Sequence, residues 1–284
     1  MISIVICNRY STIALGLARN IKDTIGAEYE VVCIDNADGH YNIFQAYNKG
    51  VQRAKGDIVC FMHDDISFHK KGWGIVVEKL FADNQKLGAL GVDGGHFMPD
   101  CPCSWSTCFT TSFRTWRTES DGSLQPYSNT EYTNGQSNVE VASIDGLWMC
   151  IRRSLFDSAI RFDDRTFSGF HCYDSDISMQ ILQTGYYIMV TFDIEIIHNS
   201  YGTYNKTYFN NIELWHKKWH EQLPVVRGID LTEREQQIHT RYAIELMERL
   251  RNDAYLYTRL HSPEYRLGHS LLKPWRFLKR KVFS

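Results

Sequence analysis

Acidic, amide and imidazole side chains directly follow apolar, strand-like runs at several places in the chain. The run that ends at Met62 is followed at once by His63, Asp64 and Asp65. Two adjacent carboxylates stay ionised more readily when a cation lies between them. Hard divalent ions such as Mg²⁺ and Mn²⁺ take oxygen ligands and bridge to phosphates. The stretch therefore predicts a divalent-metal site and a phosphate-bearing ligand such as a nucleotide diphosphate.

The same pattern recurs after other apolar runs. The polar residues are Asn8 and Arg9 after the first run, Asp35 and Asn36 after the second, Asp145 within a later run and His198 after the last. Ligands bind at the carboxyl ends of parallel strands, so these side chains are expected at one edge of a sheet. A single Asp after a strand is most often a turn residue or a helix cap, and only the joint pattern favours a site.

The elements that would position these groups alternate between strand and helix. The expected strands are Ser3–Cys7, Tyr29–Asp35, Asp57–His63, Leu87–Val92, Val139–Arg152 and Tyr186–Ile197. The expected helices cover residues 13–25, 42–55, 72–83, 153–159 and 174–184. This alternation predicts an α/β fold with a mostly parallel, Rossmann-like central sheet and helices on both faces. The segment 93–138 is rich in Ser, Thr, Asn and aromatic residues; it is expected to be irregular and to act as a lid.

The C-terminal part of the chain has a different character. Residues 204–221 and 231–260 are expected to be helical, so we predict a catalytic domain over 1–203 and a helical C-terminal extension over 204–284. The last twelve residues, K-P-W-R-F-L-K-R-K-V-F-S, hold five basic residues and no acidic one. This end is compatible with an anionic membrane surface, with an ordinary solvated terminus and with a homodimer contact.

Composition excludes some classes of protein. The chain has 284 residues and a net charge of −2, whereas a dedicated nucleic-acid binder usually carries a basic excess. No apolar run approaches the roughly 20 residues of a membrane-spanning helix, and the first run has no positively charged segment before it. We therefore expect a cytoplasmic protein, with peripheral contact at the inner face of the membrane as an option for its C-terminal end.

The eight cysteines are read as free thiols. Those in apolar runs are Cys7, Cys33, Cys60 and Cys150. They are typical of buried thiols in a reducing compartment. A second set, Cys101, Cys103 and Cys108, lies in a polar segment, where the spacing C-x-C-x4-C lacks the C-x2-C pairs of zinc sites. Free thiols are therefore favoured over zinc there as well.

Two common nucleotide-binding signatures are absent from the sequence. There is no G-x-x-x-x-G-K-[ST] loop and no G-x-G-x-x-G after the first strand. The first absence disfavours a P-loop NTPase, and the second disfavours a dinucleotide-binding Rossmann domain.

Five stretches resemble, in order and at the right spacing, the motifs of family-two glycosyltransferases, which have the GT-A fold. They are I-S-I-V-I-C-N-R-Y, E-Y-E-V-V-C-I-D-N-A, A-Y-N-K-G-V-Q-R-A-K-G-D-I-V-C-F-M-H-D-D, I-D-G-L-W-M-C-I-R-R-S-L-F and F-H-C-Y-D-S-D-I-S-M-Q-I-L-Q-T-G-Y. The resemblance covers about residues 1–200. One such motif would be weak support, but five in sequence are strong.

The resemblance implies a role for particular residues. Asp174 would be the general base, and Asp65 and His198 would bind the metal. The nucleotide would be bound by Asn8, Arg9, Asp35, Asn36, Asn48 and Asp64. The strand that should flank the acceptor supplies three candidates for acceptor binding, Asp145, Gly146 and Trp148, and His171, three residues before Asp174, is a fourth. Core burial is at least as compatible with Trp148 as stacking on a sugar.

Two positions depart from the family pattern. His63 stands where the family has the first Asp of D-x-D, and Tyr173 stands where it has the Glu before the base. For His63, packing at the strand end is favoured over metal ligation.

The activity that the resemblance implies is inverting sugar transfer in polysaccharide or glycoconjugate assembly. The donor would be a nucleotide-sugar, and a UDP-sugar is the first choice. The acceptor would be a saccharide or a lipid-linked molecule, and the cofactor would be Mn²⁺ or Mg²⁺. A sugar nucleotidyltransferase is a weaker alternative, because the loop C-N-R-Y-S-T lacks the glycines that would hold a triphosphate. A non-catalytic sugar- or nucleotide-binding protein is a second alternative, which the departures at His63 and Tyr173 leave open.

Overall fold

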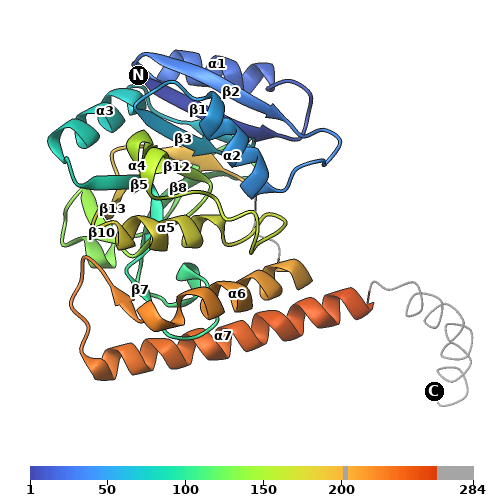
Figure 1. Ribbon diagram of the computed structural model, residues 1–284, viewed down its shortest axis with the longest axis vertical. Coiled ribbons are helices and arrows are strands. Elements are labelled where there is room, and N and C mark those ends of the chain that lie inside the picture. Colours follow the sequence, from blue (N-terminus) through green and yellow to red (C-terminus); the bar gives the residue numbers. More distant parts are fainter. Residues whose placement is uncertain (201–203, 261–284) are drawn as a thin grey trace, which may run out of the picture. The chain divides into compact units, whose positions relative to one another are not determined.

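The computed structural model describes residues 1–200 and 204–260, and its largest sheet has seven strands with helices packed against it (Figure 1). The strands run in the order β10-β13-β5-β12-β3-β1-β2. They are β1 (Ile2–Asn8), β2 (Tyr29–Asp35), β3 (Ile58–Met62), β5 (Leu87–Gly91), β10 (Asn138–Val141), β12 (Trp148–Arg152) and β13 (Tyr187–Thr191). Strands β3 and β5 are buried throughout, as expected for central strands covered on both faces.

The α/β class is confirmed, but the prediction of a mostly parallel sheet is wrong. Strand β1 pairs in parallel with β2 and β3, and β13 pairs in parallel with β5. Strand β12, however, lies antiparallel between β3 and β5, and β10 is antiparallel to β13. The apolar run 139–152, which reads as one strand, forms three separate strands: β10 at the edge of the central sheet, β11 (Ser143–Ile144) in another sheet, and β12 between β3 and β5.

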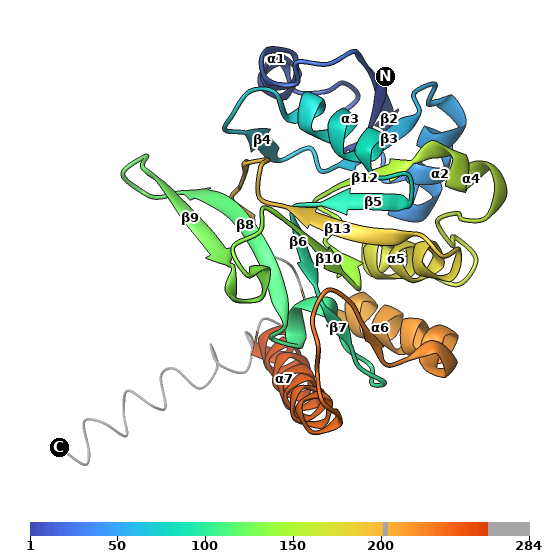
Figure 2. The ribbon, with the colours of Figure 1, turned by 90° about the vertical axis from the view of Figure 1, so that its left-hand side faces the viewer.

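Helices cover both faces of the central sheet (Figure 2). They are α1 (Leu15–Thr24), α2 (Ile43–Arg53), α3 (Trp73–Asp83), α4 (Arg153–Ser158) and α5 (Tyr173–Gln183). Ile21 of α1 and Val77 of α3 join one apolar cluster with Ile4 of β1. On the other face α2 packs so closely that a Cβ at Gly50 would lie 2.2 Å from a methyl carbon of Val5. Helices therefore pack on both sides of β1, the strand that ends at Asn8, directly before Arg9.

A second, six-stranded sheet stands beside the first. Its main path is β11-β6-β8-β14-β4, with β9 paired to β8. The strands are β4 (Ile66–Phe68), β6 (Asp93–Gly95), β8 (Thr111–Thr118), β9 (Leu124–Asn129), β11 (Ser143–Ile144) and β14 (Ile196–His198). A two-stranded sheet joins β7 (Phe97–Met98) to β15 (Val225–Val226). The expectation of an irregular 93–138 segment is therefore wrong, since most of it forms strands and two 3₁₀ turns, Trp105–Thr107 and Glu131–Thr133.

The helical prediction for the C-terminal part is confirmed for the described residues. Helix α6 spans Lys206–Trp219 and α7 spans Glu233–Leu260, with a 3₁₀ turn at His220–Gln222. The chain forms two compact units, Met1–Ile244 and Glu245–Ser284, while the boundary predicted after residue 203 stays a prediction. No helix within the described ranges has the length and apolar character needed to cross a membrane. The basic, aromatic end at 273–284 lies outside the described residues.

Candidate functional site

A cavity of about 740 Å³ opens where the two sheets meet. Its lining includes side chains from the ends of β1, β3 and β14, from the start of α5 and from one face of β8. The polar groups that the sequence places after separate strands are thus partly gathered at one place. The cavity is large enough for a nucleotide-sized ligand and lies within the 300–1,000 Å³ range of ligand sites.

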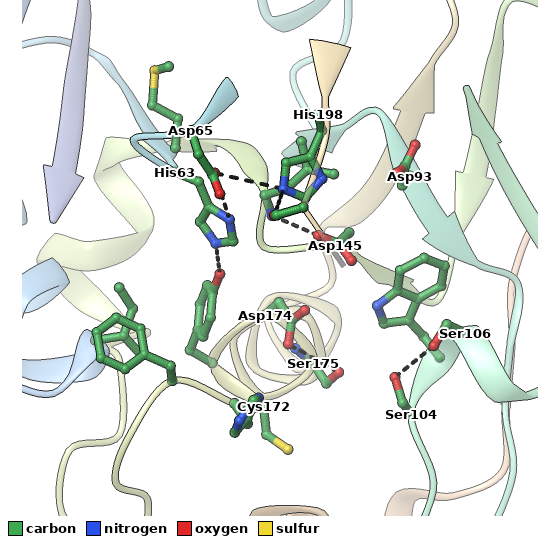
Figure 3. A pocket seen from close by; sticks show the side chains of 18 of the residues that line it. His63, Asp65, Asp93, Ser104, Ser106, Asp145, Cys172, Asp174, Ser175 and His198 are labelled. Atoms are coloured by element: carbon green, nitrogen blue, oxygen red, sulfur yellow. Dashed lines mark hydrogen bonds and ion pairs between the residues drawn. The ribbon is translucent and has the colours of Figure 1, made fainter. Parts of the chain in front are cut away.

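Three side chains at one end of the cavity are arranged as a metal site could require. Suitable ligand atoms of His63, Asp65 and His198 all lie within 4.8 Å of one another. Nδ1 of His63 is 3.9 Å and Nε2 of His198 is 3.7 Å from Oδ1 of Asp65 (Figure 3). Among the residues that the structure describes, this is the one such group, so Cys101, Cys103 and Cys108 do not form another.

Strand pairing explains how residues so far apart in sequence meet. His198 ends β14 and pairs with Ile66 of β4, which directly follows Asp65. His63 follows β3 and donates its backbone N–H to the carbonyl of Leu147 at 3.0 Å. The sequence favours a packing role for His63. In the structure its imidazole instead lies with Asp65 and His198 in the three-residue group that could bind a metal, hereafter the metal group. The end of β3, the start of β4 and the end of β14 therefore bring the three side chains together.

The two imidazoles are in the form that binds a metal. Burial lowers the pKa of His63 to about 4 and also lowers the pKa of His198. Both rings are then neutral at pH 7, with a lone pair on one nitrogen. Nε2 of His63 shares a hydrogen bond with the hydroxyl of Tyr173 at 2.7 Å, which fixes the ring with Nδ1 toward Asp65. Two neutral imidazoles and a carboxylate fit a divalent ion such as Mn²⁺.

Asp64 is held by a residue of the chain itself. Its carboxylate accepts from the guanidinium of Arg9 at 2.8 Å and from the Arg9 backbone N–H at 3.2 Å. The same guanidinium lies 3.9 Å from Asp65. The adjacent carboxylates therefore face different partners: Asp64 faces Arg9, and Asp65 faces the two imidazoles.

The other predicted nucleotide-binding residues do not line the cavity. Asn8 is buried and donates to the carbonyl of Tyr10, and Asn36 bonds both backbone groups of Tyr41. These contacts shape the loops after β1 and β2. Asp35 is exposed beside them and accepts from the backbone N–H of Ala37.

Asn48 is directed to another part of the molecule. Its side-chain amide pairs with both backbone groups of Phe162, at 2.8 and 3.2 Å. It lines a second cavity, on the outer side of α2, together with His40 and Lys49. The structure thus brings Arg9 and Asp64 to the main cavity, but not Asn48.

Two acidic side chains face the cavity near the start of α5. Oδ2 of Asp174 accepts from the backbone N–H of Gly146 at 3.2 Å, and its Oδ1 accepts from the N–H of Ser175 at 2.7 Å. Oδ1 of Asp145 accepts from the N–H of Leu147 at 2.7 Å. Burial raises the pKa of Asp174. Burial and the nearby charge of Asp174 raise the pKa of Asp145 to about 7. One proton is therefore readily held by this pair near neutral pH.

A third acidic residue, Asp93, was missed in the sequence. It begins β6 and lines the same cavity, and its backbone carbonyl accepts from the N–H of Asp145 at 2.8 Å. Burial, followed by the charge of Asp145, raises the pKa of Asp93 well above its usual range. The signal that singled out the other carboxylates, an acid directly after an apolar strand, applies equally to L-G-A-L-G-V-D.

The acceptor candidates are divided between cavity and core. Asp145 and His171 line the cavity, and the ring of His171 packs edge-on against Tyr208. Trp148 is fully buried beside Trp73 and does not line it. Gly146 is packed against Tyr173, and a Cβ at this position would come within 2.2 Å of the Tyr173 hydroxyl.

Comparison with known proteins gives one family match. A family model described as "Glycosyltransferase like family" matches residues 1–221. No curated protein matches the chain.

Two similar solved structures have low identity. One is the crystal structure of GalNAc-T7 with UDP, GalNAc and Mn²⁺, at 11% identity and TM-score 0.47, with 70% of this chain covered. This chain spans only 43% of that protein. The other is the crystal structure of A197 from STIV, at 10% identity and TM-score 0.41, with 82% of this chain and 96% of that chain covered.

Proposed function

The chain belongs to the glycosyltransferase-like family, and from this premise we propose that it transfers a sugar from a nucleotide-sugar to a hydroxyl group with inversion at the anomeric carbon. The match over residues 1–221 confirms the resemblance read from the five sequence motifs. The proposed acceptor is a saccharide or a lipid-linked molecule, and the proposed role is in polysaccharide or glycoconjugate assembly.

One observation carries this proposal. The His63, Asp65 and His198 group and the Asp174 carboxylate line the same cavity. Sugar transfer from a nucleotide diphosphate needs a group that stabilises the leaving diphosphate and a group that takes the proton of the attacking hydroxyl. In this proposal the His63, Asp65 and His198 group serves the leaving diphosphate, and Asp174 takes the proton.

The metal is proposed to be held by His63, Asp65 and His198. When bound, it would supply Lewis-acid stabilisation of the departing diphosphate. Imidazole ligands suit Mn²⁺ better than Mg²⁺, which prefers oxygen ligands, so Mn²⁺ is the proposed ion. Arg9 holds Asp64 at 2.8 Å and keeps that carboxylate from competing for the ion.

Asp174 is the proposed general base. It is only partly buried, and two backbone N–H groups orient its carboxylate toward the cavity. Its position in the first turn of α5 favours the ionised form, because the N-terminus of a helix carries partial positive charge. The neighbouring Asp145, with a pKa near 7, is a carboxyl that stays largely protonated in slightly acidic solution and can donate a hydrogen bond to a sugar hydroxyl.

The test is a transfer assay with UDP-, GDP- and dTDP-sugars and a panel of saccharide acceptors, with Mn²⁺ and with chelator. The proposal predicts Mn²⁺-dependent transfer from one donor class, and product analysis should give the inverted anomer. Asp174→Asn should lower transfer by about 10²–10⁴-fold while leaving donor binding in place. Donor binding without transfer or hydrolysis by the wild type would instead support a non-catalytic binding protein.

A further inference from the structure

The second cavity, on the outer side of α2, has a volume of about 580 Å³. Its walls are the outer side of α2, the loop before that helix, the helix α4 and the segment that follows α4. Among the described residues, none lines both this cavity and the main one. The second cavity is therefore a separate place for a ligand, and its volume falls within the usual range of ligand sites.

Lys49 gives this cavity a positive centre. Its ammonium lies 4.8 Å from the centroid of the Tyr41 ring, and this cation–π contact holds it over the face of the ring. In the described part of the chain, the lysines that form ion pairs are Lys70, Lys79 and Lys218. Lys49 therefore has no carboxylate counter-ion among these residues.

The acidic side chain of the lining is already paired. Asp164 accepts from the guanidinium of Arg161 at 2.6 Å. It is the one acid among the described lining residues, whereas Lys49 and Arg161 are both cationic. The cavity therefore carries an excess of positive charge, which a ligand with an anionic group would balance.

Two glutamine side chains of α2 supply groups that can recognise hydroxyls. The side-chain oxygen of Gln45 accepts from the backbone N–H of Asn42 at 3.2 Å, which leaves the amide nitrogen for a ligand. Gln52 lines the cavity too and is exposed. A carboxamide both donates and accepts hydrogen bonds, as a sugar hydroxyl does. Phe156 and Ile160 add apolar surface, against which the C–H face of a sugar can pack.

Hydrogen bonds fix the walls of the cavity in the absence of a ligand. Both backbone groups of Tyr41 are bonded to an asparagine side chain of the loop after β2. Asn48 joins α2 to both backbone groups of Phe162. The side chain of Gln180 in α5 bonds both backbone groups of Arg161. Because the site is formed in advance, little conformational entropy is lost when a ligand binds.

We propose that the second cavity binds an acidic sugar unit, one that carries a carboxylate or a phosphate group. The ammonium of Lys49 contacts the anionic group, and the amides of Gln45 and Gln52 contact the hydroxyls. Carboxylate and phosphate share this chemistry, and the experiment below separates them. The inference goes beyond the proposed function and does not depend on it, because Ile43 and Tyr47 of α2 line the main cavity and these three residues do not.

The experiment measures the binding of small probes by NMR titration, with chelator present and without nucleotide, so that no metal occupies the metal group. The probes are glucuronate, glucose 6-phosphate, glucose and inorganic phosphate. The variant is Lys49→Gln. The matched control is Arg53→Gln, because Arg53 is a basic, exposed residue of the same helix that lines neither cavity. Thermal unfolding of each variant checks that the fold is retained.

Glucuronate or glucose 6-phosphate should bind the wild type about 10-fold more tightly than glucose, because a charged partner strengthens the hydrogen bond to Lys49. Lys49→Gln should lose this preference and bind the charged sugar about 10-fold more weakly. Arg53→Gln should bind like the wild type. The tighter of the two charged sugars identifies the anionic group that the cavity prefers.

A wild type that binds neither charged sugar, or that binds glucose equally well, would overturn the inference. So would wild-type affinity for the charged sugar in Lys49→Gln. Inorganic phosphate that binds as tightly as glucose 6-phosphate, without binding of glucuronate, would overturn it too, because the cavity would then hold a small anion and not a sugar. None of these results bears on the proposed function, which the transfer assay tests separately.

Discussion

The imidazole of His63 and the hydroxyl of Tyr173 share a hydrogen bond of 2.7 Å across 110 positions of sequence. This contact links the metal group to helix α5, which carries Asp174. Hydrogen bonds to the second nitrogen of a metal-binding histidine fix the ring and raise its basicity. The hydrogen bond therefore connects the proposed metal-binding residues to the helix that carries the proposed general base.

Removal of that hydroxyl should weaken metal binding without unfolding the protein. Tyr173→Phe keeps the buried ring, and we expect Mn²⁺ affinity to fall by about 10–100-fold. A Mn²⁺ titration by calorimetry measures the effect. Tyr47→Phe is the matched control, because the buried hydroxyl of Tyr47 has no hydrogen-bond partner among the described residues and its ring packs on Tyr173. Equal Mn²⁺ affinity in the wild type and in Tyr173→Phe would show that the bond does not serve the metal group.

Asp176 lies two residues after the proposed base and has a structural role. It is 1% exposed, accepts from the indole of Trp219 at 2.8 Å, and forms an ion pair with Lys218 at 2.8 Å. Loss of one partner of a buried pair is costly, so Asp176→Ala should lower the free energy of unfolding by about 3 kcal/mol. Urea denaturation measures this change.

The surface pair formed by Lys79 and Asp83 supplies the control for that measurement. Asp83 is well exposed, so Asp83→Ala should cost less than about 1 kcal/mol. If Asp176→Ala were as mild as Asp83→Ala, the contacts of Asp176 with Trp219 and Lys218 would not support the fold.

Gly146 should tolerate no side chain. A Cβ there would lie 2.2 Å from the hydroxyl of Tyr173, and the backbone N–H of Gly146 donates to Asp174. Gly146→Ala should therefore destabilise the protein by about 1–3 kcal/mol and reduce transfer strongly, because it displaces both side chains. Gly16→Ala in α1, where a Cβ meets no described atom within 4 Å, should change stability by less than about 1 kcal/mol. If Gly146→Ala were as stable as the wild type and transferred sugar at the wild-type rate, the close packing of Gly146 against Tyr173 would be contradicted.

Asp145 should make a recognisable contribution to the pH dependence of stability. Its pKa rises from 3.8 in the unfolded chain to about 7 in the folded one, through burial and the charge of Asp174. Between these values the folded state holds a proton that the unfolded state has lost, so this group lowers stability as pH rises from about 4 to 7. His63, with its lowered pKa, has the opposite effect in the same window.

The difference in stability between the wild type and Asp145→Asn isolates the contribution of Asp145 to the pH dependence. Urea unfolding of the metal-free wild type and of Asp145→Asn at pH 4.5 and pH 8 is the measurement. The variant should gain stability relative to the wild type as pH rises, by an amount on the order of a few kcal/mol at most. A constant difference between the two proteins across this range would mean that Asp145 ionises normally.

The sequence predicts the elements whose pattern is strong. The run I-S-I-V-I-C forms the buried β1, and the repeating apolar positions from Leu17 to Ile25 form the face of α1 that packs on the sheet. Strand β8 was not predicted, because its Thr, Phe and Arg side chains face a cavity rather than an apolar core and so lack apolar alternation. At residues 145–147 the backbone N–H of Gly146 donates to Asp174, a contact that no local pattern around residue 145 reveals.

The site was predicted in part for a similar reason. Asp65, Asp174 and His198 are placed together as expected, since each stands at the end of a predictable element. The sequence favours a packing role for His63, and its hydrogen bond to Tyr173, 110 positions away, has no local signal in the sequence. Trp148 has the chemistry of a sugar-stacking residue but points into the core, and the side of the sheet that a residue faces follows from strand order rather than from residue type.

The measurement that tests the central claim most directly is calorimetric titration of UDP, GDP and dTDP into the wild type and Asp65→Ala, with and without Mn²⁺. Asp100→Ala is the control, because Asp100 forms a 2.7 Å pair with His216 and does not line the cavity. The account predicts that one nucleotide binds the wild type and Asp100→Ala only when Mn²⁺ is present, and that Asp65→Ala loses this binding. Mn²⁺-dependent binding that persists in Asp65→Ala, or a wild type that binds no nucleotide with Mn²⁺, would contradict it.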